Sequence, residues 1–148
     1  MKSLQISNHE FFALAKEMLQ QGKSVDIRVK GNSMRPFLFD GETVTVAPIL
    51  PNSILSEGLI ILTDTSFHKV MMHRICRIEG DIITMRGDGN LMQRESVHRS
   101  QIFGIVETFT RKGRTISPYS PIRRVSAQLW NFYPIRRIGL FLVRIFCH

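Results

Sequence analysis

The first residue of the chain whose surroundings could support chemistry is a serine in a short segment of small residues, Gly31-Asn32-Ser33-Met34-Arg35-Pro36. Gly31 and Asn32 tolerate the positive φ angles that a tight turn often needs. A serine hydroxyl becomes a good nucleophile only when a base lies within hydrogen-bond distance, and a third group that holds the base improves it. The usual role of a serine in a turn is to form the turn, so this segment alone does not define a site.

Two later segments contain the other residue types that this chemistry requires. Met72-His73-Arg74-Ile75 contains a histidine, and the unperturbed histidine pKa near 6.5 suits a base that works at neutral pH. Arg86-Gly87-Asp88-Gly89-Asn90 contains a carboxylate in a glycine-rich loop. A predicted hairpin places His73 and Asp88 on neighbouring strands, where a base and its orienting carboxylate could meet.

The three segments suggest a division of roles. Ser33 would be the nucleophile, His73 would take its proton and later protonate the leaving amine, and Asp88 would orient and stabilise the imidazolium. The backbone N–H of Ser33 would be one donor to the oxyanion. Lys69 is a second candidate for the base, in a serine–lysine dyad, but it lies four residues before His73.

The three motifs occur in the order Ser33-Met34-x-Pro36, His73-Arg74-Ile75 and Gly87-Asp88-x-Asn90, and together they resemble the type I signal peptidase superfamily over roughly residues 25–107. The motif with His73 most resembles the branch of this superfamily found in the endoplasmic reticulum and archaea. Enzymes of that branch have a histidine where the bacterial enzymes have a lysine. The Gly-Asn-Ser-Met sequence also resembles LexA-like self-cleaving repressors, which share the peptidase fold. The resemblance implies catalytic roles for Ser33, His73 and Asp88, a substrate groove shaped in part by Met34, and no metal or cofactor.

One position departs from the family pattern. Bacterial signal peptidases carry a serine two residues before the nucleophile, and its hydroxyl binds the oxyanion, whereas this chain has Gly31 there. The second oxyanion donor would then be the side-chain amide of Asn32 or another backbone N–H.

The elements that must position these residues are mostly strands. A capping box at Ser7 and Glu10 predicts a helix over 7–22, where apolar residues follow helical spacing. Alternation, apolar runs and turn signals then predict strands over 25–30, 43–47, 59–62, 69–78, 82–85 and 101–109. We therefore expect a mainly β (α+β) fold, with a curled antiparallel sheet or barrel of the signal peptidase–LexA type and a catalytic domain over 1–117.

The last part of the chain, residues 118–148, differs in character. Amphipathic helices are predicted over 122–132 and 135–146, separated by Pro134. Residues 1–107 contain 12 basic and 12 acidic residues, while residues 108–148 contain 8 basic residues and no acid, so the tail accounts for the whole net charge of +8. A basic, aromatic-rich tail predicts peripheral contact with an anionic membrane or a membrane protein. A helix pair packed on its own sheet is the alternative, and nucleic acid is less favoured because the tail is so apolar.

Composition limits the remaining possibilities. The chain has 148 residues and is 43% hydrophobic, which fits one globular domain. No apolar run approaches the roughly 20 residues that span a bilayer. Cys76 and Cys147 form neither a disulfide framework nor a metal-binding spacing. No secretory signal peptide is visible, so we expect a cytoplasmic protein, held peripherally at the inner membrane surface by its tail.

These observations favour a serine endopeptidase that cleaves a leader or signal-like segment of a precursor peptide. A LexA-like regulator that cleaves itself is one alternative, although the N-terminal region has room for only one helix. A catalytically inactive peptidase fold that binds peptides or recruits a membrane is the other, and the missing hydroxyl at Gly31 supports it.

Overall fold

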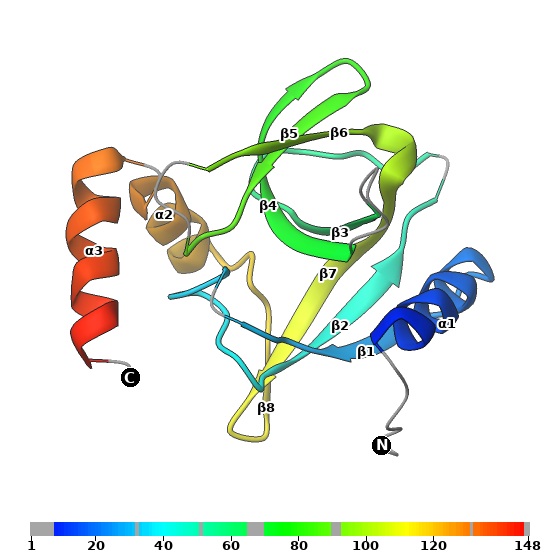
Figure 1. Cartoon of the computed structure of the whole chain (residues 1–148), viewed down its shortest axis with the longest axis horizontal. Coiled ribbons are helices and arrows are strands. Elements are labelled where there is room, and N and C mark those ends of the chain that lie inside the picture. The colour runs from blue at the N-terminus through cyan, green and yellow to red at the C-terminus, as the bar shows by residue number, and fades with distance from the viewer. Residues whose placement is uncertain are drawn as a thin grey trace.

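The strands of this chain form one curled antiparallel sheet, as the alternating sequence pattern predicted (Figure 1). The computed structural model describes residues 8–31, 33–50, 52–64, 70–89, 93–130 and 132–146. Within them, the strands are β1 (Val25–Arg28), β2 (Thr43–Pro48), β3 (Ile60–Asp64), β4 (Val70–Glu79), β5 (Ile82–Arg86), β6 (Glu95–His98), β7 (Ile102–Arg111) and β8 (Arg114–Ile116).

The sheet order is β1-β2-β7-β3-β4-β5-β6, and β8 pairs with β7. Every described pairing is antiparallel. The register shifts between Thr45 and Val46 where β2 meets β7, and between Leu62 and Thr63 where β3 meets β7. Such irregularities increase local twist and bend strands, which accounts for the curl of the sheet.

Two apolar clusters fill the molecule. The larger one includes Leu19, Ile27, Val44 and Phe109 and lies between the sheet and the first helix. The smaller one gathers around Ile75 from strands β3 to β7. Burying one such aliphatic side chain contributes about 1.5–3 kcal/mol, so these clusters supply the main stabilisation of the sheet that carries the site.

The N-terminal helix α1 (Asn8–Gln20) confirms the predicted helix, while Ser7 of the predicted capping box lies outside the described residues. Ala15 and Leu19 are buried one helical turn apart, so this side of α1 faces the sheet. The helix ends before Gly22, whose φ of +83° suits a C-terminal cap.

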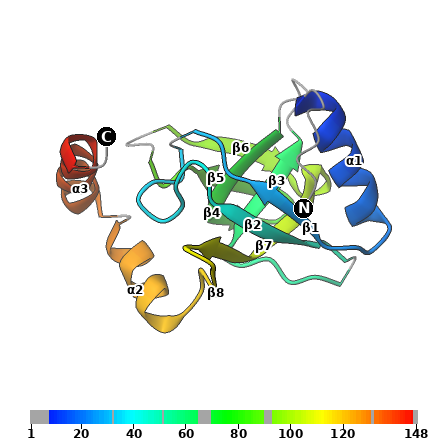
Figure 2. The same cartoon turned by 90° about the horizontal axis from the view of Figure 1, so that it is seen from below.

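The two C-terminal helices, α2 (Pro121–Trp130) and α3 (Tyr133–Phe146), were also predicted. Pro134 lies in the first turn of α3 rather than between the helices, because the first helical turn does not need its missing N–H. Figures 1 and 2 both show α2 and α3 at the end of the molecule opposite α1. Of the helices that the structure describes, none has the length and apolarity needed to cross a membrane.

Strand β6 and the following 3₁₀ turn (Arg99–Gln101) were not predicted. β6 is four residues long and three of these are polar, so its alternation is too short to stand out. The turn is fixed by its own side chains, since Gln101 accepts from the backbone N–H of His98 at 2.8 Å.

Candidate active site

The serine segment is a closed turn between β1 and β2. The backbone N–H groups of Phe37 and Leu38 both donate to the carbonyl of Met34, at 3.0 and 2.9 Å. Gly31 has a φ of +82°, as expected for a turn glycine, and its N–H donates to Asp40 Oδ1 at 2.8 Å. These bonds fix the backbone around Ser33, which is half-buried.

An ion pair braces the residues that follow the serine. Glu42 accepts hydrogen bonds from the guanidinium of Arg111 and from the N–H of Phe39, and Arg111 also donates to the carbonyl of Phe37 at 3.1 Å. Burial by itself would raise the pKa of Glu42, but the bonds from Arg111 and Phe39 outweigh it and lower this pKa. The brace therefore stays ionised at neutral pH and holds the turn from outside.

Met34 and Asn32 were predicted to bind substrate, and the structure describes the first of them. Met34 was expected to shape a substrate groove, but its side chain is 2% exposed and belongs to the main core. Because Met34 is packed among aliphatic side chains, it anchors the serine turn to the core. Asn32, the predicted second oxyanion donor, lies outside the described residues.

His73 lies on β4 and is 4% exposed. Its Nδ1 is 2.9 Å from Oε2 of Glu95 on β6. Met85 of β5 pairs with Ile75 on one side and with Glu95 on the other, which puts these side chains on the same face of the sheet. His73, two residues before Ile75, shares this face, so a carboxylate reaches the imidazole across the width of β5.

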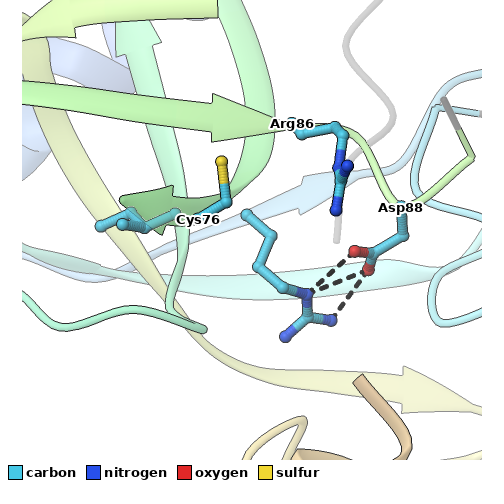
Figure 3. A pocket seen from close by; sticks show the side chains of 5 residues that line it. Cys76, Arg86 and Asp88 are labelled. Carbon is cyan, nitrogen blue, oxygen red and sulfur yellow. Dashed lines mark hydrogen bonds and ion pairs between the residues drawn. The ribbon is translucent and has the colours of Figure 1, made fainter. Parts of the chain in front are cut away.

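Asp88 has another partner. Its two carboxylate oxygens accept from Nε and Nη2 of Arg74, at 2.9 and 2.8 Å (Figure 3). The indole N–H of Trp130 donates to the backbone carbonyl of Asp88 at 2.7 Å. The sequence predicted that Asp88 would contact His73, but in the structure its carboxylate binds Arg74. Arg74 and Asp88 thus form a buried ion pair.

A β-bulge explains why Asp88 faces away from His73. The β4–β5 hairpin pairs Glu79 with Ile82, and an unbroken register from that pair would put His73 opposite Asp88. The register instead shifts by one residue between Ile75 and Arg77, so that Arg74 pairs with Arg86. Asp88, two residues beyond Arg86, consequently lies on the Arg74 side.

The surroundings of Asp88 are strongly cationic. Arg74, Arg86 and Asp88 line a water-sized pocket, which Figure 3 shows together with the thiol of Cys76. Burial, followed by repulsion from Arg94, lowers the pKa of Arg86, while Asp88 acts in the opposite direction. The Asp88 carboxylate thus lies against buried positive charge.

The serine turn and the histidine hairpin are joined directly. The N–H of Gly89 donates to the carbonyl of Ser33 at 2.7 Å. The guanidinium of Arg74 lies 5.1 Å from the ring centroid of Phe37, within the range of a cation–π contact. The loop after β5 and the residue next to His73 therefore both contact the segment that carries Ser33.

The remaining candidates do not form a competing site in the part of the chain described. Lys69, the second candidate for the base, lies outside that part. The exposed His98 is bonded to Ser100. Cys76 is half-buried, with its thiol 3.4 Å from the carbonyl of Thr84. No three histidine, cysteine or carboxylate side chains of the described residues gather in a way that could hold a metal ion.

Three residues at the site were missed by sequence reasoning. Glu95 was missed because β6 was not predicted, although it follows the glycine-rich loop by only a few residues. Trp130 and Arg136 were assigned to the tail, yet both bind the loop: Arg136 donates to the carbonyl of Gly87 at 2.6 Å. Trp130 is the one tryptophan of the sequence, and this could have indicated a structural role.

The curled sheet, with a serine turn joined to a histidine-bearing hairpin, defines a serine-peptidase fold of the LexA/signal peptidase superfamily. The Peptidase S24-like family matches residues 1–107, more than two thirds of the chain, and the chain belongs to this family. The superfamily predicted from the three motifs is thereby confirmed. No curated protein matches the sequence.

Proposed function

We propose that the protein is a serine endopeptidase in which Ser33 is the nucleophile and His73 is the general base. The observation that carries this proposal is the contact of the buried His73 with Glu95, next to a β5–β6 loop that is hydrogen-bonded to Ser33. An imidazole that a carboxylate holds in one orientation is suited to act as the general base of a serine nucleophile.

The proposed reaction runs through the Nε2 nitrogen of His73. A carboxylate only accepts hydrogen bonds, so the Nδ1 of His73 carries the hydrogen that faces Glu95, and Nε2 is the nitrogen that takes the Ser33 proton. The Ser33 oxygen attacks the peptide carbonyl, and His73 then protonates the leaving amine. Water, activated by the same nitrogen, releases the acyl group. The Ser33 N–H is the first oxyanion donor.

In this mechanism Asp88 is a positioning residue. Its carboxylate is occupied by Arg74, and its neighbour Gly89 donates to the carbonyl of Ser33. Asp88 and Arg74 thus fix the loop that in turn fixes the serine turn. Glu95 takes the orienting role that the sequence suggested for Asp88.

The substrate we propose is a leader or signal-like segment of a precursor peptide, supplied by another molecule. A LexA-like self-cleavage is the second candidate, and membership of the Peptidase S24-like family favours it. Helix α1 argues against self-cleavage over residues 8–20, because Ala15 and Leu19 anchor it in the core.

The experiment is labelling with a serine-reactive acylating probe, read by intact mass. We expect a single adduct on the wild type and none on Ser33→Ala or His73→Ala. The matched controls are Ser126→Ala and His98→Ala, since both residues are exposed and lie outside the site, and these variants should label like the wild type. Incubation without probe tests self-cleavage, which would appear as two fragments that sum to the intact mass.

An adduct that survives Ser33→Ala would assign the nucleophile to another residue. The absence of an adduct on the folded wild type with several probes would favour an inactive, peptide-binding member of the fold.

A further inference from the structure

Helices α2 and α3 expose an unusual amount of apolar surface. On α2, Ile122, Val125 and Leu129 are exposed and lie three and four residues apart, which places them on one side. On α3, the exposed stripe includes Ile138 at 61% and Phe141 at 60%, and it continues through three further residues, Ile135, Leu142 and Ile145. We refer to these eight residues as the apolar stripe.

Arginines border the apolar stripe. Arg124 on α2 and Arg137 and Arg144 on α3 are exposed, and the helical spacing puts them beside the stripe rather than within it. The two helices contain five arginines and no acidic residue. The surface is therefore both apolar and uniformly positive.

The opposite sides of the two helices are firmly docked. Trp130 packs so closely on α3 that a Cβ at Gly139 would lie 2.1 Å from its ring, and it also forms an edge contact with Phe37. Arg136 is 1% exposed and binds the loop at Gly87. The apolar stripe therefore lies on the outer side of the α2–α3 pair, whose other side already packs against the rest of the protein.

We propose that the apolar stripe and its arginines bind the surface of an anionic lipid bilayer, with the helices lying in the plane of the interface. Apolar side chains would enter the acyl boundary while the guanidiniums contact phosphates. A second copy of this chain is a poorer occupant, because it would bring the same positive charge against the stripe without any acidic partner.

Lipid binding would place the candidate site at the membrane surface. The helices that carry the stripe also hold the backbone of residues 87–88, and residue 89 is bonded to Ser33. The inference rests on the helices alone, so it holds whether or not the protein is a peptidase.

The test is flotation of the full-length protein with vesicles, comparing phosphatidylglycerol–phosphatidylcholine mixtures with pure phosphatidylcholine. We expect the wild type to float with the anionic vesicles and to be released by high salt. Arg137→Gln/Arg144→Gln should lower the affinity roughly 30-fold, since each basic residue near the surface contributes about a factor of five. Ile138→Ser/Phe141→Ser should lower it at least about tenfold.

Matched variants remove the same chemistry elsewhere on the surface. Arg28→Gln/Arg114→Gln and Leu14→Ser/Ile82→Ser change exposed residues on β1, β8, α1 and β5, and they should float like the wild type. Failure of the wild type to float with anionic vesicles would overturn the proposal. A concentration-dependent dimer that Ile138→Ser/Phe141→Ser abolishes, without flotation, would assign the stripe to a second copy.

Discussion

The contact between His73 and Glu95 determines which nitrogen of the imidazole can act as a base. A histidine whose Nδ1 donates to a carboxylate keeps one tautomer and one ring orientation. Glu95 is half-buried at the edge of the sheet, while His73 is buried, so the pair is screened from water on the histidine side. The position of one carboxylate is thus the main chemical difference from the arrangement expected from the motifs.

Replacing Glu95 by Gln tests this role. Gln keeps the size of the side chain but no longer stabilises the imidazolium, so the acylation rate should fall about 10²-fold or more while probe binding stays unchanged. The pH profile of the acylation rate should also shift, which a merely structural role would not cause. Glu107→Gln is the control, because Glu107 is exposed on β7. Equal rates for Glu95→Gln and the wild type would remove Glu95 from the mechanism.

The sequence identified candidates for the nucleophile and for the base because each lies in a motif with fixed spacing. It could not find the partner of His73, because that depends on the register of β4 against β5. Alternation gives the face of each residue within a strand, but a single extra residue, Cys76 in the bulge, reverses the face of everything beyond it. Bulges leave no reliable mark in the sequence.

At the scale of elements, α2 and α3 act as a clamp on the loop between β5 and β6. Trp130 binds the carbonyl of Asp88 and Arg136 binds the carbonyl of Gly87. Burial, followed by repulsion from Arg86, lowers the pKa of Arg136 to about 10, so its buried charge costs stability that the loop contact offsets in part. The helices themselves were predictable from 3.6-residue spacing, whereas their docking site depends on two buried side chains.

Two substitutions at Trp130 should separate the contribution of its ring to stability from the contribution of its indole N–H. Trp130→Ala leaves a cavity beside Gly139 and Phe37 and should lower the free energy of unfolding by about 3–5 kcal/mol. Trp130→Phe keeps an aromatic ring but leaves the Asp88 carbonyl without this donor. It should lower the free energy of unfolding by about 1–3 kcal/mol. Urea denaturation measures both.

The neighbouring Leu129→Ala is the control for Trp130, because Leu129 is exposed and its loss should change stability by less than about 0.5 kcal/mol. If Trp130→Ala were as stable as Leu129→Ala, the clamp would not contribute to folding.

At the scale of the whole molecule, Tyr119 connects the tail to the sheet. Its hydroxyl donates to the carbonyl of Val106 on β7 and accepts from the N–H of Ile60 on β3 at 3.1 Å. The phenol thus bridges two adjacent strands just before α2 begins. The overall fold class could be predicted from the strand pattern, but this bridge depends on a residue that follows the last strand by three positions.

The ionisation of Tyr119 gives the bridge a pH dependence. Burial raises its pKa to about 12, against the effect of the Ile60 bond and of Arg74 and Arg124. Between about pH 10 and about pH 12 the unfolded state therefore loses the phenol proton while the folded state keeps it. Stability should fall across this range as pH rises, by about 2–3 kcal/mol in total.

The measurement is guanidinium denaturation at about pH 9 and about pH 11, for the wild type and Tyr119→Phe. The variant should be less stable at the lower pH, by about 1–3 kcal/mol, because the Ile60 N–H and the Val106 carbonyl lose their partner. It should lose less stability than the wild type between the two pH values, because it has no phenol to ionise. Comparing the two proteins cancels groups they share, including Arg136, whose lowered pKa acts with the opposite sign. An equal loss in both would mean that Tyr119 ionises in the folded protein as it does in the unfolded chain, and that the tail is not secured to the sheet by a buried phenol.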